Sequence, residues 1–270
     1  MPPRLTIDSP QNPRVKALVK LRERRARERQ GRFVVEGARE VKRALEAAVP
    51  LRELYICPSF LGPEGRELLS RVSPALEVLE LSQAAFKKAS QREHPDGVLA
   101  VARARELSLA ALELGDDALV LVLDGLEKPG NLGALLRTAD GAGVAAVFAT
   151  GAGTDFYNPN VIRASMGSVF SLPALPVDGP ALLGWLGARG YRIVAASPQA
   201  ALSYWQERYL GRVAIVLGTE HQGLSEGWET AAHGRVKVPM RGAADSLNVA
   251  TAGALLVYEA LRQRLQASSD

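Results

Sequence analysis

The chain has 270 residues, of which 47% are hydrophobic, so it can bury a large core in one large domain or two modest ones. Its one cysteine, Cys57, excludes an internal disulfide and a zinc cluster of the usual kind, and no apolar run reaches the roughly 18 residues that a membrane span needs. The net charge is +4 and the first residues lack the apolar core of a signal peptide, so we expect a cytoplasmic protein with no metal and no membrane segment.

The charge is unevenly distributed along the chain. Residues 1–105 carry 21 Lys and Arg against 13 Asp and Glu, whereas residues 106–270 carry 12 against 16. A basic front part on a mildly acidic back part favours a polyanionic partner, although basic surfaces also occur without one. RNA or DNA is the obvious candidate.

The first predicted element is a helix in which Asn12 is the cap and Pro13 occupies the first position. The helix runs into residues 22–29, where five arginines outnumber two glutamates. This stretch is either a solvated helix with i,i+4 ion pairs or a surface that contacts phosphates. In the second interpretation the RNA-binding residues are Arg22, Arg24, Arg25 and Arg32.

Short apolar runs and helical stretches then alternate up to about residue 105, which predicts a small α/β domain. The expected strands are 33–35, 54–56, 76–81 and 98–101, and the expected helices are 38–48 and 65–72. Together with the leading helix, this part forms a domain over residues 1–105. Residues 106–117 are expected to be a linker.

From residue 118 onward the strands change character, because they are continuous apolar runs that are buried on both faces. The fold class is therefore α/β, with a mostly parallel sheet and helices on both of its faces, over residues 118–270. The expected strands are 118–123, 144–149, 193–196 and 213–217, and the expected helices are 131–142, 180–189 and 246–266. Ligands bind such sheets beyond the carboxyl ends of the strands, so the loops that start at Asp124, Ser197 and Gly218 are the predicted pocket wall.

One apparent motif is discarded. Residues 141–146 fit the glycine pattern of dinucleotide-binding proteins, but that pattern must follow a strand and open a helix. Here it follows a helix and precedes a strand, so we interpret it as a helix end and a turn.

Polar residues at two helix starts are the candidate site. Asn131 is a suitable helix cap, which is the simple explanation for it. Arg137 lies among apolar residues of what is expected to be a core-packed helix, where a guanidinium needs an anionic partner such as phosphate. Near the end of the chain, Ser246 is the expected cap of the last helix, and Asn248 is expected inside its first turns as a buried amide.

A third segment follows the buried strand at 213–217. Gly218 and Gly223 allow the backbone to approach a ligand closely. Glu220 is either a surface cap or a group in the predicted pocket, and its position favours the second interpretation.

Three ordered motifs in this part resemble those of the SPOUT superfamily, in its TrmH (SpoU) branch of RNA ribose 2′-O-methyltransferases. The motifs are Asn131-x-Gly-Ala-x-x-Arg-Thr-Ala, Leu217-Gly-x-Glu-x-x-Gly and Val238-Pro-Met-x-Gly-x-x-x-Ser-Leu-Asn-Val. The front part is similar to the L30e-like RNA-binding domain of rRNA-directed members, through residues 9–21 and 33–37.

The resemblance implies a deep trefoil knot, which sequence rules alone would not predict, and a homodimer whose active site is shared across its interface. It also implies that S-adenosylmethionine binds in the knotted loops, at Gly218, Thr219, Val238, Met240 and Leu247. Arg137 is implied to act on the 2′-hydroxyl, either as its activator or as a charged group that holds phosphate and stabilises the developing alkoxide. The groups implied to orient the reactants are Asn131, Glu220, Ser246 and Asn248.

The expected reaction is methyl transfer from S-adenosylmethionine to a ribose 2′-oxygen, with 23S ribosomal RNA as the expected substrate. Two alternatives stay open: the same reaction on tRNA, and a non-catalytic RNA-binding or ribosome-assembly protein with the same fold. The separate basic front domain favours rRNA, because such a module binds folded RNA elements by their shape and exposed bases.

Overall fold

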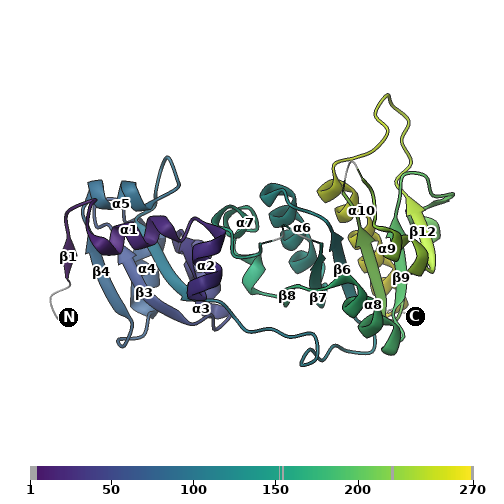
Figure 1. Ribbon diagram of the computed structural model, residues 1–270, viewed down its shortest axis with the longest axis horizontal. Coiled ribbons are helices and arrows are strands. Elements are labelled where there is room, and N and C mark those ends of the chain that lie inside the picture. Colours follow the sequence, from purple (N-terminus) through teal and green to yellow (C-terminus); the bar gives the residue numbers. More distant parts are fainter. Residues whose placement is uncertain (1–4, 152, 154, 220–221, 269–270) are drawn as a thin grey trace. The chain divides into compact units, whose positions relative to one another are not determined.

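The computed structural model describes residues 5–151, 153, 155–219 and 222–268 (Figure 1). Within this part of the chain, no helix is long and apolar enough to cross a membrane. The same residues contain no group of three or more His, Cys, Asp and Glu side chains arranged to hold a metal ion.

The chain forms two compact units. Unit 1 consists of Met1–Glu106 and Tyr157–Ser171, and unit 2 consists of Leu107–Phe156 and Leu172–Asp270. An internal segment of the chain therefore belongs with the first unit, which no sequence pattern indicated.

Unit 1 is built on a five-stranded mixed sheet with the strand order β1-β4-β3-β5-β2. β5 runs antiparallel to β2 and β3, and the other neighbours are parallel. The strands are β1 (Thr6–Ile7), β2 (Arg32–Glu36), β3 (Leu51–Ile56), β4 (Glu77–Leu81) and β5 (Val98–Arg103). The small α/β fold expected for this part is confirmed.

Helices cover both faces of this sheet. They are α1 (Pro13–Lys20), α2 (Arg24–Gln30), α3 (Ala38–Glu46), α4 (Pro63–Arg71), α5 (Gln83–Ala89), α7 (Pro159–Ala164) and the short η1 (Ser168–Phe170). α1 and α5 share one apolar core with alternate strand residues, including Leu99 and Val101. Residues 157–171 are held by aromatic stacking, since the ring of Phe33 lies 4.3 Å from that of Tyr157 and 5.9 Å from that of Phe170.

The continuous leading helix expected from the sequence is wrong. α1 ends at Lys20, and α2 begins at Arg24 after a short turn. The buried Arg27 explains the break, because its Nη1 donates to the carbonyl oxygens of Leu21 at 2.8 Å and Arg22 at 2.6 Å. The Arg27 guanidinium thus satisfies the carbonyl oxygens of the turn. In a continuous helix, backbone N–H groups would have bound these oxygens.

Unit 2 contains a seven-stranded sheet with the order β10-β12-β9-β11-β6-β7-β8, and all its pairings between these strands are parallel. The strands are β6 (Leu119–Asp124), β7 (Ala146–Thr150), β8 (Ala174–Pro176), β9 (Arg192–Ala196), β10 (Leu202–Ser203), β11 (Val213–Leu217) and β12 (Gly234–Lys237). The four long strands match the expected apolar runs, which confirms the parallel sheet. β8, β10 and β12 were not anticipated, because they are short.

The helices of unit 2 are α6 (Pro129–Gly141), α8 (Gly179–Ala188), α9 (Glu226–Ala231), α10 (Val249–Ala267) and the short η2 (Tyr204–Gln206). α8 and α9 pack on one face through Trp185 and Trp228. α6 and α10 cover the other face (Figure 1). A Cβ atom at Gly253 would lie only 2.5 Å from the side chain of Leu135 and 2.6 Å from that of Leu217, so α10 approaches α6 and β11 closely.

Two further expectations concern connections. α6 ends at Gly141, Gly143 has a φ of 69°, and β7 begins at Ala146, which confirms that the discarded glycine motif is a helix end and a turn. The stretch expected to be a linker carries leucines that pack against the core of unit 2, namely Leu109, Leu112 and Leu114. The trefoil knot stays a prediction.

Candidate active site

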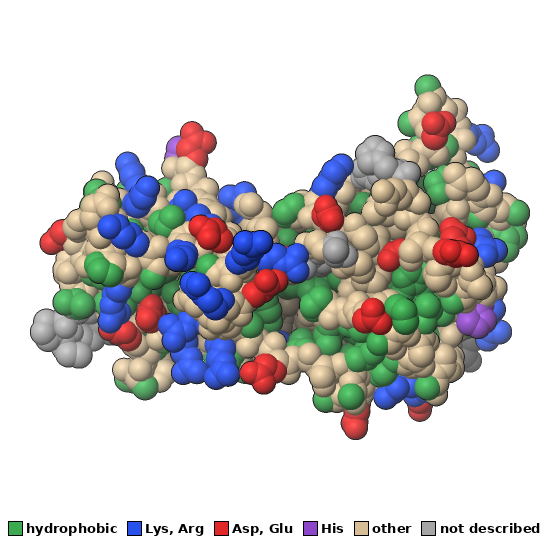
Figure 2. Space-filling model, viewed as in Figure 1, with side chains coloured by type: hydrophobic (Ala, Val, Ile, Leu, Met, Phe, Trp, Pro, Cys, Tyr) green, Lys and Arg blue, Asp and Glu red, His purple; other side chains and the backbone are tan. Residues whose placement is uncertain are grey.

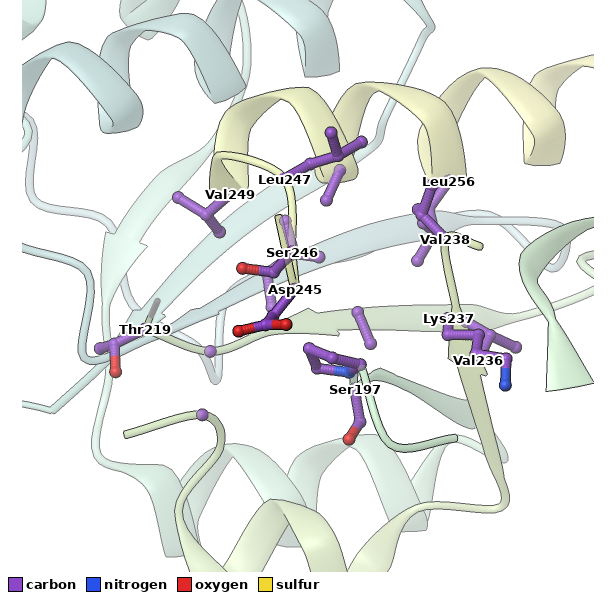
Figure 3. Close-up of a pocket in the computed structure, with 16 residues that line it drawn as sticks. Ser197, Thr219, Val236, Lys237, Val238, Asp245, Ser246, Leu247, Val249 and Leu256 are labelled. Carbon is purple, nitrogen blue, oxygen red and sulfur yellow. The ribbon is translucent and has the colours of Figure 1, made fainter. Parts of the chain in front are cut away.

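A cavity opens at the carboxyl ends of β9, β11 and β12, which are neighbours in the sheet (Figure 3). It encloses about 660 Å³ of empty space, part of it open to solvent. Its wall is formed by residues 196–198, 217–219, 223, 236–238, 245–247, 249, 252 and 256. The pocket wall predicted at Ser197 and Gly218 is therefore confirmed, whereas the loop that starts at Asp124 does not line this cavity but an adjoining hollow.

The loop after β11 has a shape that requires glycine. The N–H of Thr219 donates to the carbonyl oxygen of Gly223 at 2.9 Å, and the N–H of Gly223 donates back to Thr219 at 3.1 Å. A Cβ atom at Gly218 would lie 2.2 Å from the same Gly223 oxygen. Gly223 itself has a φ of 69°, a conformation that favours glycine.

A buried polar cluster ties this loop to the sheet. Asp124, at the end of β6, is 8% exposed. One of its carboxylate oxygens accepts from the hydroxyl of Thr150 at 2.8 Å, and the other accepts from the N–H of Ser225 at 2.7 Å. The indole N–H of Trp228 donates to the same Thr150 hydroxyl at 3.3 Å. The end of the loop after β11 is thereby fixed to the carboxyl ends of β6 and β7.

A second hollow adjoins the first. It is lined by residues 125–128, Asn131, Thr219 and Val249, and the last two also line the first cavity. The amide nitrogen of Asn248 donates to the side-chain oxygen of Asn131 at 3.0 Å. This bond joins the starts of α6 and α10, which are 117 residues apart in the chain.

The capping roles differ from those expected. Lys128 precedes α6 as its N-cap residue, and Asn131 is the third residue of the helix. Asn248, expected inside the last helix, is its N-cap and accepts from the N–H of Ala250 at 3.0 Å. Ser246, the expected cap, lies two residues earlier and is exposed. The oxygen of the Asn248 amide thus binds the helix backbone, while its nitrogen donates to Asn131.

Arg137 does not lie in the environment that the sequence indicated. Leu135, Leu136 and Ala139 are buried, but Arg137 is on the exposed side of α6. It lines neither of the two hollows. The inference of a buried guanidinium is therefore wrong, because neighbours in sequence on a helix point in different directions.

Four of the five expected cofactor residues line the first cavity: Gly218, Thr219, Val238 and Leu247. Met240 is outside that set, and Glu220 lies outside the described residues. The wall also contains Val236 and Lys237, which sequence reasoning missed. They belong to β12, whose four residues include two basic ones and so lack a strand signal.

The four predicted RNA-binding arginines fall into two groups. Nη2 of Arg22 donates to three carbonyl oxygens at the end of α5, at 2.8 to 2.9 Å. Arg24 forms an ion pair with Glu28 at 2.7 Å. Arg25 and Arg32 are exposed, and no described residue forms a hydrogen bond or ion pair with either. Figure 2 shows basic side chains gathered over α1 and α2.

This division predicts different effects for two arginine substitutions. Arg22→Ala is expected to lower the free energy of unfolding by about 1–2 kcal/mol, because three helix-end carbonyls lose a charged donor. Arg25→Ala is expected to leave stability within about 0.5 kcal/mol and to weaken binding to an rRNA fragment, with a shallower salt dependence. Chemical denaturation and binding titrations at two salt concentrations measure both. Equal stability losses would contradict the division.

The cavity lies where parallel strands end, beside polar side chains from the starts of two helices. This arrangement is typical of α/β proteins that bind a small cofactor. Residues 118–258 match the SpoU rRNA Methylase family, and residues 12–100 match the MRM3-like substrate binding domain. The chain belongs to the SpoU rRNA methylase family, as its three motifs predicted.

Relatives match along nearly the whole chain. The 23S rRNA (uridine(2479)-2′-O)-methyltransferase of Streptomyces viridochromogenes is 32% identical over 249 residues, which cover 90% of this chain and 86% of that protein. A solved RNA 2′-O ribose methyltransferase is 46% identical with a TM-score of 0.87, over 97% of this chain and 100% of the other. The SpoU methyltransferase AviRb from Streptomyces viridochromogenes, solved with AdoMet, is 30% identical with a TM-score of 0.87, over 94% and 99%.

The first cavity fits S-adenosylmethionine, the cofactor of this family. Apolar side chains such as Val236, Leu247 and Leu256 offer surfaces for an adenine ring. The hydroxyl groups of Ser197, Thr219 and Ser246 offer partners for a ribose or an amino-acid group, and they line the same cavity.

Proposed function

We propose that this protein transfers a methyl group from S-adenosylmethionine to a ribose 2′-hydroxyl of 23S ribosomal RNA. The observation that carries the proposal is the cavity at β9, β11 and β12, whose wall contains the family's motif residues and lies against the hollow lined by Asn131. The match to a 23S rRNA methyltransferase over 90% of the chain supports the substrate.

The bound cofactor supplies an electrophilic methyl group on a sulfonium, which is a good leaving group, so the residues must mainly position the reactants. The backbone around Gly218, Val238 and Leu247 holds the cofactor. Asn131 and Asn248 form one hydrogen-bonded pair at the wall of the second hollow, where the RNA ribose is placed. Ser246 and Glu220 complete the orienting set. The hydroxyl proton leaves to solvent as the oxygen–carbon bond forms.

Arg137 acts in this proposal as a cation. It is exposed to solvent on α6. Its fork of N–H groups binds the phosphate next to the target ribose and stabilises the developing negative charge on the 2′-oxygen. Because Arg137 lines neither the cofactor cavity nor the hollow that contains Asn131 in its own protomer, a second copy of the chain supplies it.

The surface of α10 supports such a dimer. Leu255, Tyr258 and Leu265 follow one face of the helix at helical spacing, and Tyr258 is 50% and Leu265 61% exposed. Tyr204 and Tyr258 line one further hollow on this face. α6 borders it, since a Cβ atom at Gly141 would lie 3.2 Å from the Tyr258 hydroxyl. Arg137 is one turn before Gly141 and so shares that side of α6.

The dimer is tested by placing a charged side chain on the apolar face of α10 that Leu255, Tyr258 and Leu265 form. Tyr258→Glu is expected to convert a dimer into a monomer in light scattering, because two carboxylates would be buried in a symmetric interface. Leu107→Glu, at a leucine that is 40% exposed in the segment before β6, is the matched control and is expected to stay dimeric. A monomeric parent protein would contradict the proposal.

Unit 1 provides the RNA-binding function in this proposal. Its match to a substrate binding domain and the exposed Arg25 and Arg32 support contact with phosphates. We propose that the protein acts in the cytoplasm, where rRNA is modified. Methyl transfer to unmodified rRNA and, separately, to tRNA distinguishes the proposed substrate from the alternative one. Cofactor binding without transfer to either RNA would favour a non-catalytic assembly role.

A further inference from the structure

The wall of the cofactor cavity contains a carboxylate with no role so far. Asp245 lies between β12 and α10, next to Ser246 and Leu247, and all three line the cavity. Figure 3 shows its carboxylate directed into the cavity, on the side where Thr219 lies. Among the described residues of this wall, Asp245 is the one acidic side chain.

The carboxylate is also unpaired within the part of the chain that the structure describes. No described residue forms a hydrogen bond or an ion pair with it. The surrounding wall is largely apolar, with Leu217, Val238 and Leu247 among its members. Asp245 itself is exposed to solvent, and a ligand that fills the cavity removes part of this water, so the attraction between the carboxylate and a bound cation is then screened less.

We infer that the Asp245 carboxylate faces the sulfonium of S-adenosylmethionine and makes the cavity prefer the methyl donor to the demethylated product. The methyl donor and S-adenosylhomocysteine share the adenine, the ribose and the amino-acid group. They differ in the methyl group and in the positive charge on sulfur, which disappears when the methyl group is transferred. An attraction to that charge is therefore present before transfer and absent afterwards, so it favours product release.

The direction of the side chain agrees with this assignment. Thr219 lines both the cofactor cavity and the hollow that contains Asn131, so it marks the place where the donor and the RNA ribose meet. The sulfonium must lie at that junction for its methyl group to reach the ribose. The inference rests on the proposed function, in which S-adenosylmethionine is the donor.

The test is calorimetric titration of the full-length protein, without RNA, with three ligands: S-adenosylmethionine, S-adenosylhomocysteine and sinefungin. Sinefungin carries a protonated amine in place of the methyl sulfonium. Asp245→Asn is expected to raise the Kd of both cationic ligands about tenfold and that of S-adenosylhomocysteine less than about twofold. Asp245→Glu, which keeps the charge, is expected to retain most of the preference.

Lys237→Gln is the matched control, because Lys237 lines the same cavity. A contact of Lys237 with the amino-acid carboxylate would be common to the donor and the product, so their Kd ratio is expected to stay constant. Equal weakening of all three ligands by Asp245→Asn would overturn the inference and assign Asp245 to a shared group such as the ribose. Unchanged affinities would overturn it as well. The titrations contain no RNA, so their outcome does not depend on methyl transfer. Failure of the proposed function would be seen in a separate assay with RNA, in which the protein binds S-adenosylmethionine but transfers no methyl group.

Discussion

Replacing Arg137 by alanine is expected to reduce methyl transfer to RNA about 100- to 1000-fold, the usual cost of losing a charge-stabilising donor at a reacting oxygen. Affinity for S-adenosylmethionine is expected to change less than about twofold, because Arg137 lines neither hollow of its unit. Single-turnover transfer and calorimetric titration measure the two effects separately. Arg137→Lys keeps the charge but loses the planar fork, so it is expected to recover only part of the activity.

Arg71→Ala is the matched control for this experiment. Arg71 is also an exposed helical arginine, at the end of α4, and its guanidinium is already paired with Glu67 at 2.7 Å. Its removal is expected to leave transfer unchanged. Substantial activity in Arg137→Ala would contradict the role of Arg137, and equal losses in both variants would point to a general effect of surface charge.

The proposal that two protomers share an active site allows a sharper experiment with the same variant. If the partner supplies Arg137, a protomer with Arg137→Ala and one that cannot bind cofactor form one intact site when they combine. Mixing the two inactive proteins is then expected to restore part of the transfer activity. No recovery in mixtures that demonstrably exchange subunits would contradict a site completed by the partner.

Replacing Gly218 by alanine is expected to raise the Kd of S-adenosylmethionine at least about 30-fold, because the loop must move to accept a side chain. The new Cβ atom would lie 2.2 Å from the oxygen of Gly223 and 2.7 Å from the nitrogen of Leu224. Both are backbone atoms, and the first belongs to the hydrogen-bonded pair between Thr219 and Gly223. Calorimetry with S-adenosylmethionine measures the change.

Gly187→Ala provides the control for the glycine substitution. Gly187 lies in α8, and apart from its chain neighbours and the backbone of its own helix no heavy atom of another described residue lies within 4 Å of the position of its added Cβ. Its replacement is expected to change the cofactor affinity less than about twofold. If Gly218→Ala bound the cofactor as well as Gly187→Ala does, the close approach within the loop would have no part in cofactor binding.

The sequence predicted the long elements of unit 2 well, because continuous apolar runs such as Val213–Leu217 are typical of buried parallel strands. Sequence-based prediction failed for short strands and at places where a contact of one side chain determines where a helix ends. β12 has four residues with alternating basic groups, which resemble a loop. The break between α1 and α2 depends on Arg27 binding turn carbonyls, and no periodicity signals such a contact. Residues 157–171 join unit 1 through stacking on Phe33, which is a long-range interaction.

The sequence predicted many residues of the candidate site, but it did not predict how their side chains are arranged. Parallel-sheet rules placed a pocket at Ser197 and Gly218, and motif resemblance added Val238 and Leu247. The pairing of Asn131 with Asn248 needed the structure, because it joins helix starts that are distant in sequence. The exposure of Arg137 needed it too, since a helical residue flanked by buried leucines can still face solvent.

Methyl transfer from labelled S-adenosylmethionine shows whether this protein methylates a ribose 2′-hydroxyl of ribosomal RNA. Purified unmodified rRNA and tRNA are offered separately to the parent protein and to Arg137→Ala. We expect label in 23S rRNA, on a ribose, and its loss in the variant. Label in tRNA alone would contradict the substrate, and no label in either RNA, despite bound cofactor, would contradict the proposed activity.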